Sequence, residues 1–539
     1  MIRGLALNFR CNALHTPCRE SVIRDDQKRR AMAANMLLVT LLPTLVTFLV
    51  TSGVWVGVFF IVGLNQPSAT NNYYYGQNTS QTTLPPPIPT YPPLETCPAA
   101  GKYSECSVDC EFQVCESVPD DLYPGVDRGT WTTTKCWLKL IESAKEEIVI
   151  GSYYWTLLLK ETDDCTDKDL CDKYSVDGQQ IFDGLIDAAK RGISIRIAMN
   201  DGGDDGYTMD EPLAIRDINP EKVRVRALNF PRFLGAGILH TKSWAVDGKH
   251  SYVGSANFDW RSLTQVKEIG VATFNCACVA EDVQRMLDIY WYMGAEDAVV
   301  PPSWPAEYTT NANHDHPYNI PRHEGPATAI HFSSAPPQLD SCGRDSDIDA
   351  MVKLIDEAED YLYMAVMDYA PSSLYDKPNT YYDKLDAAIK RAAFDRFVDV
   401  KFMMSKWAHT KKKSFSYIHE FDDFSYYLPC KPNVSPCQSG KIEAKIFQMP
   451  EDAYAGIPYA RVQHTKYFVT EKAAYIGTSN WSSDYWISTG GIGIGVRSAD
   501  AGGKEQLVEQ VKNLYMQDFT SDYAIPIYKF TINGTLIDN

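Results

Sequence analysis

Two segments of this chain place histidine and lysine in the same order and at the same spacing. They read HTKSWAVDGKHSYVGSAN at residues 240–257 and HTKYFVTEKAAYIGTSN at residues 464–480. In an extended strand residues i and i+2 face the same side, so each histidine shares a side with the lysine that follows it. The sequence therefore predicts two matching half-sites, His240 with Lys242 and His464 with Lys466.

Two such half-sites, if they meet, form a receptor for a phosphodiester. The lysines would neutralise the non-bridging oxygens, and Asn257 and Asn480, near the end of each segment, would donate hydrogen bonds. One imidazole can attack phosphorus to form a phosphohistidine while the other protonates the departing oxygen, because an ordinary histidine pKa of about 6.5 suits both tasks. Water activated by the second ring would then release the first.

The alternative is that these histidines are ordinary strand residues, or metal ligands. Histidine is scarce, with 10 among 539 residues, yet both segments share the lysine at +2 and an acid at +7, which are Asp247 and Glu471. Such agreement rarely arises by accident. Lysine is a poor metal ligand and the cysteines lack CxxC spacing, so we expect neither a metal site nor a cofactor. The two acids are interpreted mainly as structural clamps and, more weakly, as participants in the chemistry.

Each motif closes a longer repeated stretch. The paired segments are 146–159 with 359–374, 185–201 with 385–407, and 223–231 with 442–450. Each half reads as strand, helix, strand, strand and then the motif, and strands interleaved with helices favour a mostly parallel sheet. The sequence predicts a duplicated α/β fold: two mostly parallel sheets with flanking helices, related by pseudo-two-fold symmetry, with one active site between them.

The N-terminal region predicts a type II membrane protein. Residues 36–64 carry no charge and exceed the roughly 20 residues that cross a bilayer, whereas the apolar part of a cleaved signal peptide is usually about 7–15 residues. Basic residues before this segment place the N-terminus in the cytosol. The predicted domains are a cytosolic tail at 1–35, a transmembrane signal anchor at 36–64, a proline-rich lumenal stalk at 65–97 and two halves at 98–325 and 326–539.

Cysteines and glycosylation sequons support a lumenal C-terminal part. Twelve of the 14 cysteines follow the anchor, which suits disulfides in an oxidising compartment. Cys106 and Cys110 are expected to pair with Cys276 and Cys278. Glycan acceptors are predicted at Asn78, Asn433 and Asn533. A fourth sequon, at Asn480, lies within the second motif and is expected to be buried.

The charge of the chain restricts where a polyanion could bind. A net charge of −18 and a pI near 5.0 argue against a protein that grips nucleic acid or anionic lipid with its whole surface, so any phosphate site must be local. The basic stretch 409–415, HTKKKSF, could guide a single strand by charge and stacking, although a solvated loop is the competing interpretation. Histidines 314, 316 and 323 are interpreted as linker residues between the halves.

The paired motif resembles that of the phospholipase D superfamily, His-x-Lys-x4-Asp-x6-Gly-Ser-x-Asn. The first copy fits fully, whereas the second has Glu471 in place of Asp and reaches Gly477 and Asn480 one residue early. That departure, the single anchor, and the stretches GSANFDWRSLTQVKEIG and YIGTSNWSSDYW are similar to the type II membrane branch that contains members 3 and 4 of the family. The resemblance covers roughly residues 100–530.

This resemblance implies a lysosomal 5′ exonuclease that acts on single-stranded DNA and RNA. The open alternatives are a phospholipase D or phospholipid transphosphatidylase, and a non-catalytic membrane receptor that keeps the fold. Residence in lysosomes or late endosomes, reached through the endoplasmic reticulum and Golgi, is expected, and a homodimer is left open.

The resemblance also implies a carboxylate after each motif that holds the histidine ring. Glu268 fits after the first motif, whereas the matching stretch of the second, WISTGG, has no acid. A carboxylate on His240 would favour that ring as general acid and His464 as nucleophile. The same carboxylate could equally stabilise a phosphohistidine at His240, so the two roles stay open.

Overall fold

The computed structural model describes residues 97, 104–160, 165–202, 208–376, 379–500 and 502–537. The predicted tail, anchor and stalk, apart from Cys97, lie outside these ranges, and so does the sequon at Asn78. Within the described ranges no helix is both long enough and apolar enough to cross a membrane.

The first half is built on an eight-stranded sheet. Its strands, in spatial order, are β2 (Trp131–Thr132), β1 (Glu111–Ser117), β10 (Glu268–Phe274), β8 (His250–Gly254), β7 (Ser243–Val246), β3 (Glu147–Ser152), β5 (Ser194–Asn200) and β6 (Val223–Leu228). A separate short pair joins β4 (Trp155–Thr156) to β9 (Phe258–Asp259).

The second half repeats this arrangement in a larger sheet. Its strands are β11 (Tyr318–Ile320), β12 (Thr328–Ala335), β19 (Gly491–Ser498), β18 (Ala473–Gly477), β17 (Lys466–Thr470), β14 (Tyr361–Val366), β15 (Asp399–Ser405), β16 (Lys441–Phe447) and β20 (Ala524–Pro526), with β13 (Asp345–Ser346) beside β12. The central order β10-β8-β7-β3-β5-β6 corresponds to β19-β18-β17-β14-β15-β16, which confirms the predicted duplication. Strand β11 belongs to this sheet although it precedes the predicted boundary at residue 326.

The expectation of mostly parallel sheets was wrong. Only β3-β5-β6 and β14-β15-β16 form extended parallel sets, connected by helices as predicted. The motif strands instead form antiparallel hairpins, β7 with β8 and β17 with β18, and the outer strands continue antiparallel. The connection that follows each motif strand, residues 247–249 or 471–472, is too short for a helical crossover, so the chain must return antiparallel beside that strand.

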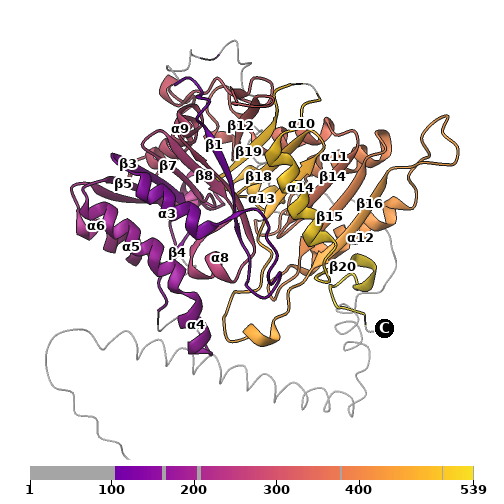
Figure 1. Cartoon of the computed structure of the whole chain (residues 1–539), viewed down its shortest axis with the longest axis horizontal. Helices are drawn as coiled ribbons and strands as arrows, with labels where there is room; N and C mark the ends of the chain where they lie inside the picture. Colours follow the sequence, from indigo (N-terminus) through magenta and orange to yellow (C-terminus); the bar gives the residue numbers. More distant parts are fainter. Residues whose placement is uncertain are drawn as a thin grey trace, which may run out of the picture. The chain divides into compact units, whose positions relative to one another are not determined.

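Helices cover the sheets, and Figure 1 shows the first half in indigo to magenta and the second in orange to yellow. The α-helices are α3 (Thr133–Ser143), α4 (Lys168–Tyr174), α5 (Val176–Lys190), α6 (Asp210–Ile218), α7 (Phe230–Leu234), α8 (Trp260–Thr264), α9 (Ala277–Met293), α10 (Asp347–Asp356), α11 (Lys384–Asp395), α12 (Lys412–Ser425), α13 (Ser483–Ile487) and α14 (Gln506–Phe519). Short 3₁₀ turns are η4 (Ala306–Tyr308), η5 (Pro337–Leu339), η6 (Asp452–Tyr454) and η7 (Ile527–Lys529).

One apolar core joins the two halves. Side chains of β8 and β10, such as Val253 and Val271, pack in the same buried cluster as Ile476 and Ile494 of β18 and β19, together with apolar residues of α9 and α14. The opposite faces are closed by separate clusters, which include α3 and α5 in the first half and α10, α11 and α12 in the second. The alternation along the strands thus places one face of each sheet in the shared core.

Six disulfides use all twelve cysteines that follow the predicted anchor. Cys106 is bonded to Cys278 and Cys110 to Cys276, so the four cysteines predicted to pair do so across the first half. The other four bonds are Cys97–Cys342, Cys115–Cys136, Cys165–Cys171 and Cys430–Cys437.

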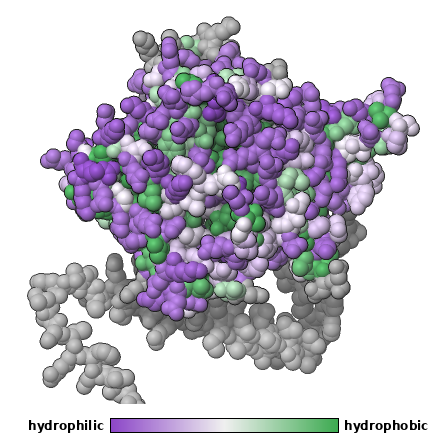
Figure 2. Space-filling model, in the orientation of Figure 1, coloured by the Kyte–Doolittle hydropathy of each residue, from purple (hydrophilic) through white to green (hydrophobic). Residues whose placement is uncertain are grey.

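The molecular surface is mostly polar. Figure 2 shows a largely hydrophilic face on which apolar side chains form small, separate groups. Of the three sequon asparagines within the described ranges, Asn433 and Asn533 are exposed, whereas Asn480 is 2% exposed. Glycan attachment therefore stays a prediction for the two surface positions, and burial of Asn480 agrees with the sequence-based expectation.

Candidate active site

Both histidine and lysine pairs lie at one buried place between the halves. His240 and Lys242 precede β7, and His464 and Lys466 occupy the matching position at the start of β17. The rings of His240 and His464 have centroids 6.5 Å apart, and both lysines are fully buried. The structure therefore brings together the two half-sites that the repeated sequence predicted.

Backbone hydrogen bonds exchanged between the halves hold the two histidines in place. The His240 N–H donates to the carbonyl of Gly490, and the His464 N–H donates to the carbonyl of Lys267, each at 2.8 Å. The first motif therefore pairs with the residue before β19, and the second motif pairs with the residue before β10. This exchange explains how residues 224 positions apart reach one site.

The two imidazoles have different partners. Nδ1 of His240 lies 2.9 Å from the carbonyl oxygen of Thr478. Nδ1 of His464 lies 2.9 Å from both carboxyl oxygens of Glu268. Glu268 thus contacts the histidine of the opposite half, and the expectation that it would hold His240 was wrong. The physical reason is the exchange described above, which places the start of β10 beside the second motif.

The corresponding position of the second half is Gly491, the first residue of β19. A side chain there would collide with the Ser479 hydroxyl, since an added Cβ would lie 2.1 Å from Oγ. His240 instead packs against the ring of Tyr485, with centroids 5.1 Å apart. The two-fold related histidines are therefore unequal: one has a carboxylate partner and the other an aromatic neighbour.

Burial and like charges shift the ionisation of the site. Burial, then Lys242 and Lys466, lower the pKa of His240 well below its usual value. Burial and the same two lysines also lower the pKa of His464. Burial lowers the pKa of Lys466 to about 7 and raises that of Glu268 to about 8. Before substrate binds, the site therefore disfavours positive charge on the two histidines and the two lysines. An incoming phosphate anion would favour their cationic forms again.

The motif asparagines meet tyrosines that the sequence analysis did not single out. Nδ2 of Asn257 donates to the hydroxyl of Tyr154 at 3.3 Å, and Nδ2 of Asn480 donates to that of Tyr485 at 3.2 Å. Both asparagines are buried. Tyr154 follows β3 in the SYYW stretch, and its place after a central parallel strand is the signal that could have identified it.

The lysines are oriented by their own segments and by the residues that follow the central strands. Each Nζ donates to the backbone carbonyl of the histidine two residues earlier. Lys242 also lies over the ring of Tyr153, 5.6 Å from its centroid, while Lys466 lies 3.9 Å from Sδ of Met367. Apolar walls at these equivalent positions keep each ammonium group directed and poorly hydrated.

Asp247 and Glu471 do not lie among the reacting groups. Asp247 accepts hydrogen bonds from the N–H groups of residues 145–147 at 2.8–2.9 Å, and Glu471 accepts from those of residues 359–361 at 2.7–3.2 Å. Each acid sits at the far end of its motif strand, five residues and roughly 16 Å of extended chain from the motif lysine. These contacts support the clamp interpretation, and a part for the two acids in the chemistry stays a prediction.

The basic stretch 409–415 borders the site. Lys411 lies over the ring of Tyr375, with Nζ 5.0 Å from the centroid, and the Tyr375 hydroxyl donates to Asp368 at 3.2 Å. Asp368 is buried and interacts electrostatically with Lys466 and Lys411. Because Tyr375 is 49% exposed, this group forms an accessible rim beside the buried lysine.

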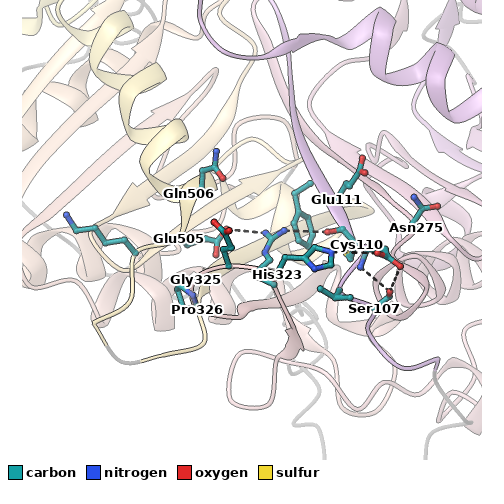
Figure 3. A pocket seen from close by; sticks show the side chains of 15 residues that line it. Ser107, Cys110, Glu111, Asn275, His323, Gly325, Pro326, Glu505 and Gln506 are labelled. Carbon is teal, nitrogen blue, oxygen red and sulfur yellow. Dashed lines mark hydrogen bonds and ion pairs between the residues drawn. The ribbon is translucent and has the colours of Figure 1, made fainter.

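Two of the linker histidines have defined structural environments. His314 is buried, with Nδ1 2.9 Å from Asp315 and Nε2 3.2 Å from Glu357. His323 is exposed beside a hollow of about 1000 Å³, seen in Figure 3, where Arg322 donates to the Cys110 carbonyl and to Glu505. The residues that line this hollow include neither motif histidine. His314 is therefore packed into the second half and the linker interpretation does not describe it, whereas His323 lies on the surface as a linker residue would.

Comparison with known proteins identifies the class to which this fold and site belong. Residues 126–435 match a family model described as "PLD3/4, PLD-like domain". The chain is 35% identical over 435 residues to the "5'-3' exonuclease PLD3" of Xenopus laevis, covering 79% of this chain and 83% of that one. It is 31% identical over 481 residues to the "5'-3' exonuclease PLD4" of Mus musculus, covering 88% and 91%.

The protein is thus a member of the phospholipase D superfamily. More narrowly, the chain belongs to the PLD3/4 family of PLD-like proteins. The resemblance drawn from the paired motifs is confirmed.

Proposed function

We propose that this protein is a metal-independent phosphodiesterase that removes nucleotides from the 5′ end of single-stranded DNA and RNA. The observation that carries the proposal is the pair of buried histidine rings 6.5 Å apart, each accompanied by a buried lysine. This spacing leaves room for one phosphorus atom between the rings. A receptor that had kept only the fold would not need both cationic pairs buried at that cost in desolvation.

The unequal surroundings of the rings suggest separate tasks. Burial raises the pKa of Glu268 to about 8, and this carboxyl group lies 2.9 Å from Nδ1 of His464, so the two groups can share one proton. When that proton lies on the ring, the Glu268 carboxylate stabilises the imidazolium, and we therefore assign His464 as the general acid and His240 as the nucleophile. The N–P bond to His240 forms as the P–O bond to the leaving group breaks, and the leaving oxygen takes a proton from His464. Water then gives a proton to His464 and attacks phosphorus, which breaks the N–P bond.

The lysines and asparagines bind the phosphate during these steps. Lys242 and Lys466 regain their charge as the anion enters, and the buried amide groups of Asn257 and Asn480 donate to its oxygens. These groups stabilise charge that develops on phosphorus oxygens, which is the role a metal ion has in other phosphodiesterases.

The names of the relatives and the rim of the site both support a nucleic-acid substrate. The matched PLD3 and PLD4 proteins are named 5′-3′ exonucleases. An exposed tyrosine with an ammonium group over its ring, as at Tyr375 and Lys411, suits a base and a neighbouring phosphate. The acidic chain needs such a local cationic site, because its overall charge repels a polyanion.

The proposed setting is the lumen of lysosomes or late endosomes. The uncharged segment 36–64, the basic tail before it and the sequons after it support a type II anchor with a lumenal catalytic part. The six disulfides suit an oxidising route through the endoplasmic reticulum and Golgi.

Activity of the purified full-length protein on defined substrates tests the proposal. We expect stepwise shortening of single-stranded DNA and RNA that carries a free 5′ end, unchanged in EDTA, and little action on the same strands when the 5′ end is blocked. His240→Ala protein is the inactive control. Hydrolysis of phosphatidylglycerol without any cleavage of oligonucleotides would instead identify a phospholipase, and abolition by EDTA would contradict a metal-free mechanism.

A further inference from the structure

A stack of aromatic side chains lies on the surface next to the site. The ring of Tyr459 stacks face to face on His409, with centroids 5.4 Å apart and planes 16° apart. His409 in turn meets Trp407 edge to face at 4.6 Å. Tyr459 is 61% exposed, so one face of this stack is open to solvent. We call Trp407, His409 and Tyr459 the aromatic ledge.

The ledge is connected to the site through one side chain. Trp407 packs against a buried cluster that contains Met367. Sδ of Met367 lies 3.9 Å from Nζ of Lys466 and 4.0 Å from Nδ2 of Asn480. The same loop carries Lys411, which reaches Tyr375 on the rim. Packing through Met367 and Trp407 therefore joins the site to the surface that carries the exposed Tyr459 ring.

The backbone that presents Tyr459 is held in an unfavourable conformation. Tyr459 has φ of 59°, a left-handed value that a bulky side chain rarely adopts. Such conformations persist where neighbouring contacts fix them, and they are frequent at ligand sites. Here Arg461 provides the contacts: its N–H donates to the Gln265 carbonyl at 2.9 Å, and its guanidinium binds both oxygens of Asp121 at 2.8 Å.

An exposed aromatic pair with a fixed backbone is more than an apolar surface patch. Ordering two large side chains on the surface costs conformational entropy, and because these side chains are largely exposed, their burial offsets little of that cost. A planar partner on the open face of Tyr459 would bury that face, and every nucleobase offers one regardless of sequence. The neighbouring ammonium group of Lys411 suits the phosphate that accompanies such a base.

We propose that Tyr459, supported by His409, is a stacking subsite for one nucleobase of the single strand, beyond the nucleotide that is removed. This inference rests on the proposed nuclease function and adds to it a contact that recognises the strand away from the scissile phosphate. Because stacking is tolerant of sequence, the subsite selects unpaired bases and not a particular base.

Oligonucleotides with one abasic position test the subsite in the full-length protein. In the wild type, moving the abasic position along the strand should reveal one place where it raises KM about tenfold, the size expected for loss of one base–aromatic stack. Tyr459→Ala should raise KM for the intact strand by a similar factor and remove the penalty at that place. Tyr459→Phe, which keeps the aromatic ring, should retain the penalty at that position.

Two controls separate recognition from folding and chemistry. Tyr427→Ala changes a tyrosine that is 84% exposed just beyond α12 and should behave as wild type. Hydrolysis of bis(4-nitrophenyl) phosphate, which has no strand to stack, should proceed at the same rate in all variants. A loss of that activity in Tyr459→Ala would overturn the proposal by showing damage to the site itself.

The remaining outcomes distinguish the two proposals. A wild-type protein that leaves oligonucleotides intact would refute the nuclease function. Oligonucleotide cleavage in which Tyr459→Ala retains the full abasic penalty would refute the subsite alone. Impaired hydrolysis of phosphatidylglycerol vesicles with normal oligonucleotide kinetics would show that the ledge serves a lipid and would also overturn the inference.

Discussion

Glu268 is the residue that most clearly distinguishes the two histidines. We expect Glu268→Gln to lower kcat on the order of 10²-fold, the size of one general acid–base contribution, because His464 loses the carboxylate that favours its protonated form. The pKa of His464 falls further, so the high-pH limb of the rate profile should move toward lower pH. Exposed Glu142→Gln is the matched control. An unshifted limb would remove Glu268 from the acid-base machinery.

Ionisation of the histidines predicts acidic operation. Burial and the lysines lower both histidine pKa values, so the general acid is protonated only on the acid side of neutrality, while the nucleophile stays neutral there. Loss of charge on Lys466, whose pKa is about 7, weakens phosphate binding as pH rises. The profile of rate against pH for an oligonucleotide should be a bell with its maximum below pH 7, roughly one unit or more acidic of neutrality. A maximum above about pH 8 is incompatible with this scheme.

At the scale of single residues, spacing predicted the reacting groups but not their partners. His240, Lys242, His464 and Lys466 follow from the repeated motif, because a strand fixes which side chains share a face. The partner of His464 could not be predicted, since the carboxylate comes from the other half through an exchange of backbone hydrogen bonds. The same holds for Tyr485, which becomes a neighbour of His240 only in the folded structure.

The motif hairpins depend on their clamping acids. Asp247 has φ of 53° and accepts three backbone N–H groups, so Asp247→Ala should destabilise the fold by about 2 kcal/mol while leaving kcat of the folded protein unchanged. Urea unfolding and kinetics on the same preparation measure both quantities. Asp247→Asn should lower the free energy of unfolding by less, because asparagine tolerates the left-handed conformation. A selective loss of kcat without destabilisation would return Asp247 to the chemistry.

The disulfides of the first half make a separate prediction. Peptide mapping without reduction should recover Cys106 joined to Cys278 and Cys110 joined to Cys276. These bonds fix the segment that leads into β1 to the start of α9, so their loss should destabilise the protein by roughly 2–5 kcal/mol. Four free thiols would contradict the fold at this place and weaken the argument for a lumenal location.

Helices and strands could be predicted where the spacing of apolar residues and the length of the segment indicated the same type of element. The strand–helix–strand order of β3, α5 and β5 follows from apolar runs and an amphipathic helix, and its repeat at β14, α11 and β15 follows from the duplication. The antiparallel hairpins were not predicted, because apolar runs such as 243–246 do not record which neighbour they pair with.

For the whole molecule, the shared core explains why the chain is duplicated. Val253 and Ile494, one from each half, pack in one cluster, and the motif segments meet only because that cluster joins the sheets. A single half would expose this face and hold half a site. The repeat in the sequence predicted that meeting, whereas the shared face could be seen only in the structure.

The central claim is that the two halves supply different histidines to one reaction. Phosphohistidine is hydrolysed in acid but survives in alkali. Reactions of 5′-³²P-labelled or internally labelled oligonucleotide should therefore be quenched in alkali, and the labelled residue should be located by peptide mapping. His464→Ala, which lacks the general base for the second step, should accumulate label on His240 when the substrate carries an activated leaving group such as 4-nitrophenol, and His240→Ala should accumulate none. Label on His464 in the His240→Ala protein, or turnover at the wild-type rate in either variant, would contradict the account.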